Sequence, residues 1–241
     1  MYRTLNILPL RIVRYSDRTS LLSAFSRELG TISFAIPAGN GPSAARRRAL
    51  LSILTPLEVE ASIRPGRDVH SFKEARALLA LHLVQTDPVR ASLAMFIAEA
   101  LLPILRQNEG DSLIFDYIVN AMARLNDKSV ATANFHIAFL VGLTSLLGIA
   151  PDSGDFRRGK VFDMVDARFR AAAPLHGRSL SPEESAAAER LMRMTWNNMA
   201  RFRFSPGQRN EVLNRILEYY TIHHANLSTL KSPEILHSLL S

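Results

Sequence analysis

The run Arg46-Arg47-Arg48 is the densest concentration of charge in the sequence. Guanidinium groups bind phosphate through charge-assisted, often bidentate hydrogen bonds, and they displace counterions when they contact a polyanion. We therefore predict that this run contacts a sugar–phosphate backbone. Other basic residues would widen that surface if they share a face with it: Arg11, Arg14, Arg64, Arg67, Lys73 and Arg76. The alternative is a solvated basic surface that has no partner.

The positive charge is unevenly distributed along the chain. Residues 1–80 contain 12 Arg or Lys and 6 Asp or Glu, whereas residues 81–241 contain 17 and 16. Nearly all of the net charge of +7 therefore lies in the first third of the chain. Such asymmetry is typical of a polyanion-binding module that is joined to a nearly neutral domain.

Aromatic residues accompany this charge. Phe25, Phe34 and Phe72 lie in the same region, and aromatic rings of small barrels often stack on unpaired bases. An aromatic residue in a small barrel is more often part of the hydrophobic core. Base stacking and core packing therefore both remain open for each of the three.

The sequence offers little to support catalysis or metal binding. The absence of cysteine among the 241 residues excludes disulfides, thiolate zinc sites and a cysteine nucleophile. Gly154–Lys160 matches part of a phosphate-binding loop, but Val161 stands where that loop needs Ser or Thr. Pairs of acidic residues such as Asp163 and Asp166 are typical of loop chemistry. We expect no catalytic residue, no metal and no cofactor, and hence a protein that is not an enzyme.

The first third has the pattern of short strands. Apolar, β-branched and aromatic residues gather at residues 7–15, 21–25, 31–36, 57–63 and 69–75. The sequence Arg64-Pro65-Gly66-Arg67 predicts a tight turn between the last two strands, and residues 43–54 have the pattern of a helix. Five short strands with a helix between the third and the fourth predict an OB-fold barrel.

The pattern becomes helical from about Leu78 onward. Asp87-Pro88, Ser181-Pro182 and Ser205-Pro206 are helix starts, each with proline at the first helical position. We predict an α+β protein, with an OB-fold domain at residues 1–78 and an all-helical domain at residues 79–241. An irregular connection is expected near residues 151–180. The methionines near Trp196 favour core packing, with a groove for a partner peptide as the alternative.

The most apolar stretch, residues 136–150, is shorter than the roughly 20 residues that cross a bilayer. His136 lies in it, and we expect a core histidine there. The first 15 residues contain no apolar run of signal-peptide length. Together with the lack of cysteine, this predicts a soluble protein of the cytoplasm that does not associate with a membrane.

The order of these segments resembles the RecO family of DNA repair proteins over nearly the whole chain. The matching segments are Ile12–Asp17, Leu57–Glu60, Pro65–Arg67, Lys73–Arg76, Asp87-Pro88, Phe96–Leu102, Asn134–His136, Leu147–Pro151, Phe162-Asp163, Asn197–Met199, Gln208–Asn210, Tyr219–His223 and Leu230–Ser232. Their order and spacing together carry the resemblance.

The resemblance implies a recombination mediator that binds single- and double-stranded DNA and anneals complementary strands. It further implies loading of a RecA-type recombinase onto coated single strands, together with RecR, in the nucleoid-associated cytoplasm of a bacterium. It implies that the helical domain docks the acidic, phenylalanine-ended tail of single-strand-binding protein, in a groove that the sequence does not place. Many members bind zinc through paired cysteines after the segment that matches Leu147–Pro151. This chain lacks them, so no zinc requirement is expected.

Two other function classes remain open at this stage. A helical interaction scaffold without direct nucleic-acid binding would use its basic face only for solubility. A nuclease or hydrolase would need a carboxylate or histidine cluster that is assembled from distant segments. The salt dependence of oligonucleotide binding and metal-dependent cleavage separate these classes from the mediator.

Overall fold

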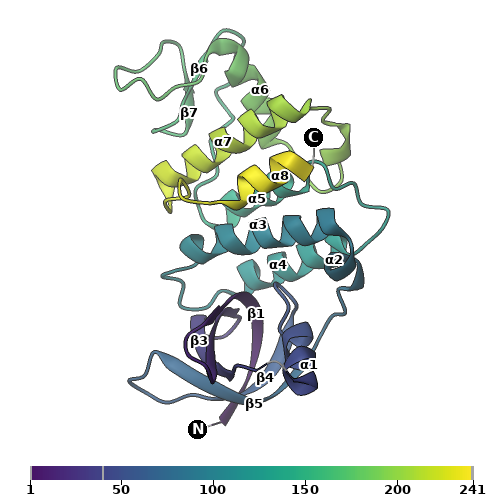
Figure 1. The fold of residues 1–241 in the computed structure, drawn as a ribbon. Coiled ribbons are helices and arrows are strands. Elements are labelled where there is room, and N and C mark those ends of the chain that lie inside the picture. Colours follow the sequence, from purple (N-terminus) through teal and green to yellow (C-terminus); the bar gives the residue numbers. More distant parts are fainter. Residues whose placement is uncertain (1, 40, 240–241) are drawn as a thin grey trace. The chain divides into compact units, whose positions relative to one another are not determined.

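A computed structural model describes residues 2–39 and 41–239. The chain divides into two compact units, residues 1–130 and 131–241, and each is described by itself. The first unit begins with a barrel built from five strands of the described chain (Figure 1). These are β1 (Tyr2–Arg14), β2 (Thr19–Ser26), β3 (Gly30–Pro37), β4 (Leu57–Ser62) and β5 (Val69–Ala77).

The barrel closes because β1 pairs with two partners. Its second half pairs antiparallel with β2, and its first half pairs antiparallel with β4. The order around the barrel is β1-β2-β3-β5-β4, with a short parallel contact between β3 and β5. This is the predicted OB-fold arrangement. The change of partner occurs at Ile7, and a register shift between Pro9 and Arg11 interrupts the pairing with β2, since proline has no N–H to donate to a ladder.

Two expected boundaries were wrong. The first strand begins at Tyr2 and not at Ile7, because pairing with β4 recruits Tyr2 to Asn6, which are mostly exposed or half-buried. The helix expected at residues 43–54 is α1 (Pro42–Leu50) and ends earlier. The chain turns after Leu50, and the side chains of Leu51 and Leu54 enter the core. The backbone N–H of Leu54 donates to the carbonyl of Pro9 at 2.8 Å, a contact that a continuing helix would not allow.

The first unit also contains α2 (His82–Thr86), α3 (Pro88–Ile104) and α4 (Ser112–Leu125). The carboxylates of Asp87 and Asp111 cap α3 and α4 by accepting the first free backbone N–H groups. Gly30 lies directly against the loop before α4. A Cβ atom at this position would lie 1.8 Å from the carbonyl oxygen of Asn108, so the close approach requires glycine. The compact unit around the barrel thus continues to residue 130, past the domain expected at residues 1–78.

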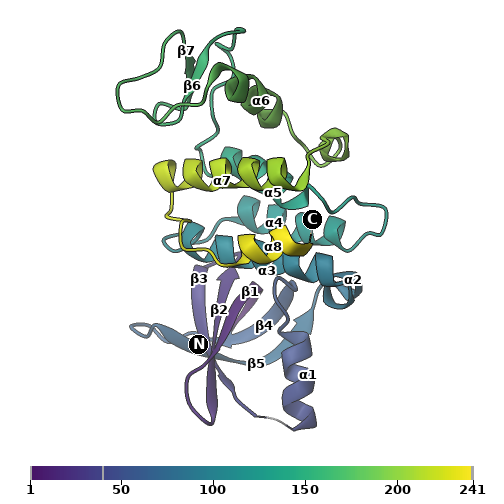
Figure 2. The ribbon, with the colours of Figure 1, turned by 45° about the horizontal axis from the view of Figure 1, so that its top comes forward.

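The second unit contains helices and one small hairpin (Figure 2). Its elements are α5 (Phe135–Leu146), β6 (Val161–Asp163), β7 (Arg168–Arg170), α6 (Pro182–Met192), the 3-10 helix η1 (Met199–Arg201), α7 (Pro206–His223) and α8 (Ser232–Leu239). The predicted capping boxes at Ser181 and Ser205 are confirmed. The connection near residues 151–180 is less irregular than expected, because β6 and β7 pair within it.

Helix α5 is the core of the second unit. Its buried residues include Phe135, Phe139 and His136, which is 1% exposed, so the predicted core histidine is confirmed. Burial and the nearby charge of Arg209 lower the pKa of His136 to about 3, since both disfavour the imidazolium. The single tryptophan, Trp196, packs its ring 4.8 Å from that of Phe135.

Met194 and Met199 are buried, so core packing is confirmed for these two methionines. No helix among the described residues is both long and apolar enough to cross a membrane.

Candidate nucleic-acid interface

The register of the barrel strands brings distant residues into one row. Residues directly opposite each other in neighbouring strands point to the same side of a sheet. Arg11 lies opposite Ser23, Ser23 opposite Ser33, and Ser33 opposite Val69. The neighbouring row contains Leu22 and Phe34, which are fully buried, so the first row points outward.

We call this surface the outer barrel face. It consists of Arg11, Val13, Leu21, Ser23, Ser33, Ala35 and Val69. Arg11, Val13 and Val69 are exposed, and the small residues between them are half-buried. A shallow strip of small side chains with a cation at its border accommodates an extended polymer without a deep cleft, and OB-folds bind oligonucleotides on this side of the barrel.

Two turns border the outer barrel face, and each carries two arginines. Arg14, the last residue of β1, and Arg18 flank the turn that joins β1 to β2. The turn that leads into Val69 holds Arg64 and Arg67, both exposed or nearly so. Gly66 at φ +73° supplies the left-handed conformation that the predicted Pro-Gly turn requires.

The arginine triplet lies on α1, as the sequence predicts for residues 46–48. None of the residues of α1, all within the described chain, is fully buried, and Leu50 at its end is half-buried against the barrel core. Arg47 donates to the carbonyl of Pro37 at 3.3 Å and Arg48 to that of Gly39 at 2.7 Å. A guanidinium has five N–H donors, so both side chains retain donors for phosphate oxygens.

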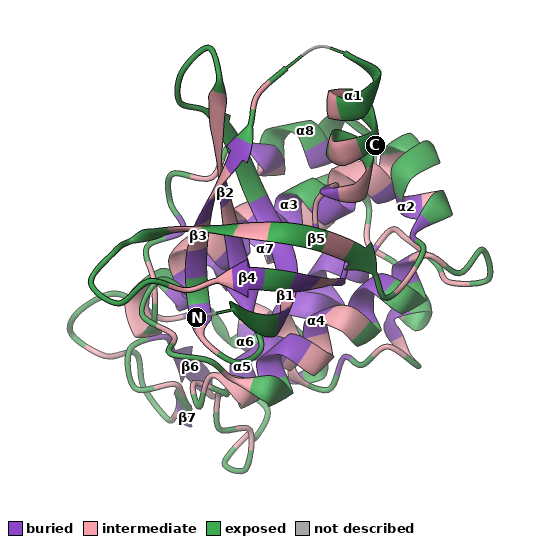
Figure 3. Ribbon diagram, turned by 90° about the horizontal axis from the view of Figure 1, so that it is seen from below, coloured by how far each residue is buried: buried purple, intermediate pink, exposed green. Residues whose placement is uncertain are grey.

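The predicted basic residues lie on several elements of the first unit. The end of β3 adjoins the β1–β2 turn, because Ala38 donates its N–H to the carbonyl of Arg18 at 2.9 Å. The arginines of α1 therefore lie near that turn. Figure 3 shows the β4–β5 turn, with Arg64 and Arg67, projecting from another side of the barrel.

Two further basic residues are engaged by the barrel itself. The ammonium group of Lys73 lies 3.8 Å from the centre of the Tyr2 ring, a cation–π contact. Arg76 forms a 2.9 Å ion pair with Glu58 on the neighbouring strand. Both residues contribute less to an anion-binding surface than their charge alone implies.

Of the two alternatives for Phe25 and Phe34, the structure shows core packing. Both side chains are fully buried, and the ring of Phe25 lies 6.3 Å from that of Phe115 in α4. Phe72 is half-buried and packs edge-to-face on Phe34 at 5.3 Å. Their inward register positions fill the core, so the rings are not available to a ligand.

A second candidate interface is a groove of about 820 Å³ in the second unit, between α6, α7 and the segment that joins them. Leu191, Phe202, Phe204 and Val212 supply apolar surface. Arginines line the same groove: Arg190, Arg193, Arg201, Arg203 and Arg215. We call this the α6–α7 groove.

The segment along this groove is held in place by buried polar groups. The side-chain amide of Asn134, which is 5% exposed, donates to the carbonyls of Met199 and Phe202 at 3.0 and 2.7 Å. Arg209 donates to the carbonyl of Phe204 at 3.2 Å. In the sequence Arg201-Phe202-Arg203-Phe204, the arginines are exposed and the phenylalanines half-buried. This alternation in the sequence is the signal that sequence reasoning missed.

Not every charge in the groove is available to a ligand. Arg215 bridges Glu184 on α6 and Glu218 on α7, at 3.2 and 3.1 Å, and Arg193 pairs with Glu189. The backbone N–H of Ser181, the N-cap of α6, donates to the carboxylate of Glu184, and the guanidinium group of Arg215 does so as well. Both interactions hold the pKa of Glu184 below its usual value. Glu183 and Glu211 also line the groove. The exposed cations at Arg190, Arg201 and Arg203 therefore carry most of its attraction for an anion.

A family model described as Recombination protein O C terminal matches residues 85–234, well over half of the chain. The chain belongs to the RecO family. It is 40% identical to the DNA repair protein RecO of Porphyromonas gingivalis over 230 residues, which cover 93% of this chain and 94% of the relative. It is 32% identical to the DNA repair protein RecO of Phocaeicola vulgatus over 100% of both chains.

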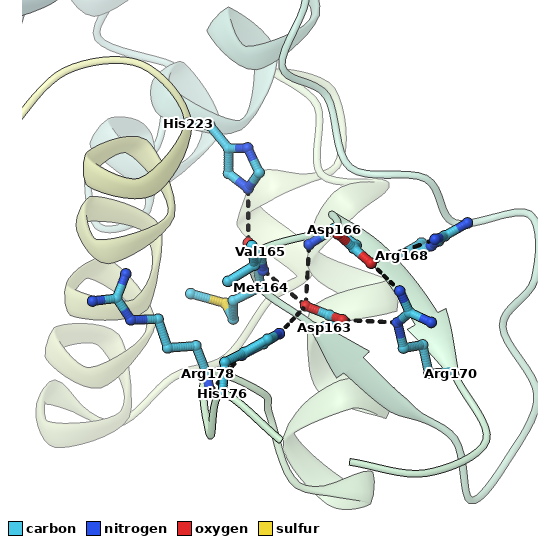
Figure 4. Close-up of polar contacts among 9 residues, drawn as sticks. All are labelled: Asp163, Met164, Val165, Asp166, Arg168, Arg170, His176, Arg178 and His223. Atoms are coloured by element: carbon cyan, nitrogen blue, oxygen red, sulfur yellow. Dashed lines mark hydrogen bonds and ion pairs between the residues drawn. The ribbon is translucent and has the colours of Figure 1, made fainter. Parts of the chain in front are cut away.

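The position where many RecO family members are expected to carry a zinc module is instead organised by Asp163. Its side chain is 1% exposed. One oxygen accepts the backbone N–H groups of Val165 and Asp166, at 2.9 and 3.1 Å, and lies 3.3 Å from Nε2 of His176. The other accepts Nε–H of Arg170 at 2.8 Å (Figure 4). A buried carboxylate needs such a complete set of donors.

This arrangement does not fit a thiolate zinc site, because Asp163 faces an arginine and the chain lacks cysteine. Within residues 2–39 and 41–239, no three His, Asp or Glu side chains come together as a metal site requires. A small apolar cluster of Phe162, Met164, Phe169, Leu180 and Tyr219 packs beside Asp163. The hairpin is thus built from an ion pair, a capped turn and apolar packing.

The salt dependence of DNA binding tests the role of α1. We expect the triple variant R46A/R47A/R48A to flatten the dependence of log Kd on log salt, by roughly 0.7 for each phosphate of a single strand that the variant no longer neutralises. The measurement is fluorescence anisotropy of a labelled oligonucleotide at several salt concentrations. The matched variant R64A/R67A tests the β4–β5 turn in the same way. An unchanged slope in the triple variant contradicts the role of α1.

Removal of the Asp163 charge tests the hairpin. We expect D163N to lower the free energy of unfolding by about 1–3 kcal/mol, because it removes a buried acceptor and leaves Arg170 without that partner. D166N is the matched control, since its side chain is 41% exposed and such pairs contribute at most about 1 kcal/mol. Urea unfolding followed by Trp196 fluorescence measures both. Equal effects of the two variants would refute the central role of Asp163.

Proposed function

We propose that this protein is a recombination mediator in DNA repair that binds single- and double-stranded DNA. The observation that carries the proposal is an OB-fold barrel with exposed arginines on α1 and on two turns, in a chain of the RecO family. The similar proteins of Porphyromonas gingivalis and Phocaeicola vulgatus are named DNA repair proteins. The exposed guanidinium groups bind phosphates and release counterions, which favours binding at low salt.

The proposed activity requires no catalytic turnover. Complementary strands repel each other because both are polyanions, and a cationic surface that holds one strand lowers this repulsion. The protein thereby anneals complementary strands and helps to load a RecA-type recombinase onto single strands coated by single-strand-binding protein. RecR is the proposed partner in loading, and the proposed location is the bacterial cytoplasm, at the nucleoid.

The α6–α7 groove supports the proposed docking of the tail of single-strand-binding protein. That tail is acidic and ends in phenylalanine. The exposed arginines at positions 190, 201 and 203 match its carboxylates, and the apolar surface around Phe202 and Phe204 matches its terminal ring. The anchored backbone lowers the entropic cost of binding, because the segment is already ordered before the peptide arrives.

Strand annealing tests the proposed function. We expect the purified protein to accelerate pairing of two complementary oligonucleotides that carry a donor and an acceptor dye, and R46A/R47A/R48A to lose most of this acceleration. R158A, in an exposed loop of the second unit, is the control. Absence of both annealing and oligonucleotide binding would favour the interaction scaffold instead. Metal-dependent cleavage of the oligonucleotide would favour a nuclease.

Tail docking is tested by titration with a labelled acidic peptide that ends in phenylalanine. We expect R201A/R203A to weaken peptide binding by about tenfold or more, because each substitution removes a charge-assisted hydrogen bond to the peptide. Replacing the terminal phenylalanine of the peptide by alanine should weaken binding to the unaltered protein similarly. R158A again serves as the control. Peptide affinity that R201A/R203A leaves unchanged would exclude the α6–α7 groove as the docking site.

A further inference from the structure

Tyr15 is an exposed aromatic residue that takes no part in the barrel core. Its exposed fraction is 74%, larger than that of any other aromatic side chain among residues 2–39 and 41–239. It follows directly after the end of β1, two residues beyond Val13 and four beyond Arg11. Because side chains alternate along a strand, Arg11 and Val13 share the outer barrel face, and Tyr15 continues this series at the turn.

The turn that carries Tyr15 is ordered by hydrogen bonds. The backbone N–H groups of Tyr15 and Ser16 both donate to the carbonyl of Thr19, at 3.0 and 2.9 Å. The hydroxyl oxygen of Ser16 accepts the backbone N–H of Thr19 at 3.1 Å and that of Arg18 at 3.4 Å. The ring of Tyr15 therefore projects from a fixed support, which reduces the entropy lost when a ligand packs on it.

Several cations lie in and next to the turn that carries Tyr15. Arg14 precedes Tyr15 and Arg18 follows it in the same turn. The end of β3, which holds Arg47 and Arg48 of α1 through its carbonyls, adjoins the turn at Arg18. The exposed Asp17 pairs with Arg14 at 3.2 Å and offsets part of the charge. An aromatic face beside several guanidinium groups is the combination with which proteins hold single strands.

We propose that Tyr15 stacks on an unpaired base of single-stranded nucleic acid whose phosphates contact Arg11 and the arginines of the β1–β2 turn. The inference rests on the proposed function and adds a preference for single strands over duplexes. A free base offers its flat face to the ring, whereas the bases of a duplex are already covered by their neighbours. Stacking contributes to affinity without releasing counterions, so its loss leaves the salt dependence unchanged.

The alternative to nucleic acid is a protein partner that covers the exposed apolar residues at the end of β1. Ile12 and Val13 are each 41% exposed and lie beside Tyr15. The arginines on both sides of the ring favour a polyanion over an apolar protein surface. The outcome of the experiment separates the two.

The experiment compares Y15A, Y15F and the unaltered protein by fluorescence anisotropy. The probes are a labelled oligothymidine and a labelled duplex of equal length, each measured at several salt concentrations. We expect Y15A to lose about tenfold in affinity for the single strand and less than about twofold for the duplex, with unchanged salt slopes. Y15F should bind like the unaltered protein, since the ring is retained. Y2A is the matched control, because Tyr2 is a half-exposed tyrosine at the other end of β1 whose ring is in contact with Lys73.

Several outcomes overturn the inference. Unchanged single-strand affinity in Y15A refutes stacking, and an equal loss on both probes refutes the preference for single strands. If Y15A binds both DNA probes like the unaltered protein but no longer binds RecR, Tyr15 and the apolar residues at the end of β1 contact a protein partner instead. If the unaltered protein binds neither probe, the proposed function itself fails. Urea unfolding of Y15A and Y2A shows whether either variant is destabilised.

Discussion

The closure of the barrel through β1 is the constraint on which the arrangement of the first unit depends. One strand of 13 residues pairs with β4 along its first half and with β2 along its second half, so it joins the two ends of the sheet and closes the barrel. Closure fixes the register of all neighbouring strands. The register in turn decides that Leu22 and Phe34 point inward and that Arg11, Ser23 and Ser33 point outward.

The net charge of a segment is a poor measure of its capacity to bind an anion. Arg76 and Lys73 are engaged by Glu58 and Tyr2, whereas the arginines of α1 lie on a helix without any buried residue in the described chain. The second unit shows the converse. Residues 131–241 hold 13 Arg or Lys against 10 Asp or Glu, a small excess, yet exposed arginines gather along the α6–α7 groove. What matters is which cations the fold leaves exposed and where it places them.

Small polar networks position the functional segments of the second unit. Asn134, buried in the core next to α5, fixes the backbone from Met199 to Phe202, and Asp163 organises the β6–β7 hairpin. Each network satisfies buried carbonyl or carboxylate groups that would otherwise destabilise the fold. Ordering of short, exposed segments thus depends on single buried side chains that are distant in sequence.

The sequence by itself determined the features that depend on local chemistry. The presence of the five barrel strands, the Pro-Gly turn before Val69, the capping boxes at Ser181 and Ser205 and the core position of His136 all follow from residues a few positions apart. Only the tertiary structure decided which side of the barrel each arginine occupies and that Phe25 and Phe34 are buried while Tyr15 is exposed. It also decided that residues 151–180 contain a hairpin around Asp163. These features depend on pairing register and on contacts between distant residues, and no local pattern of residue types encodes them.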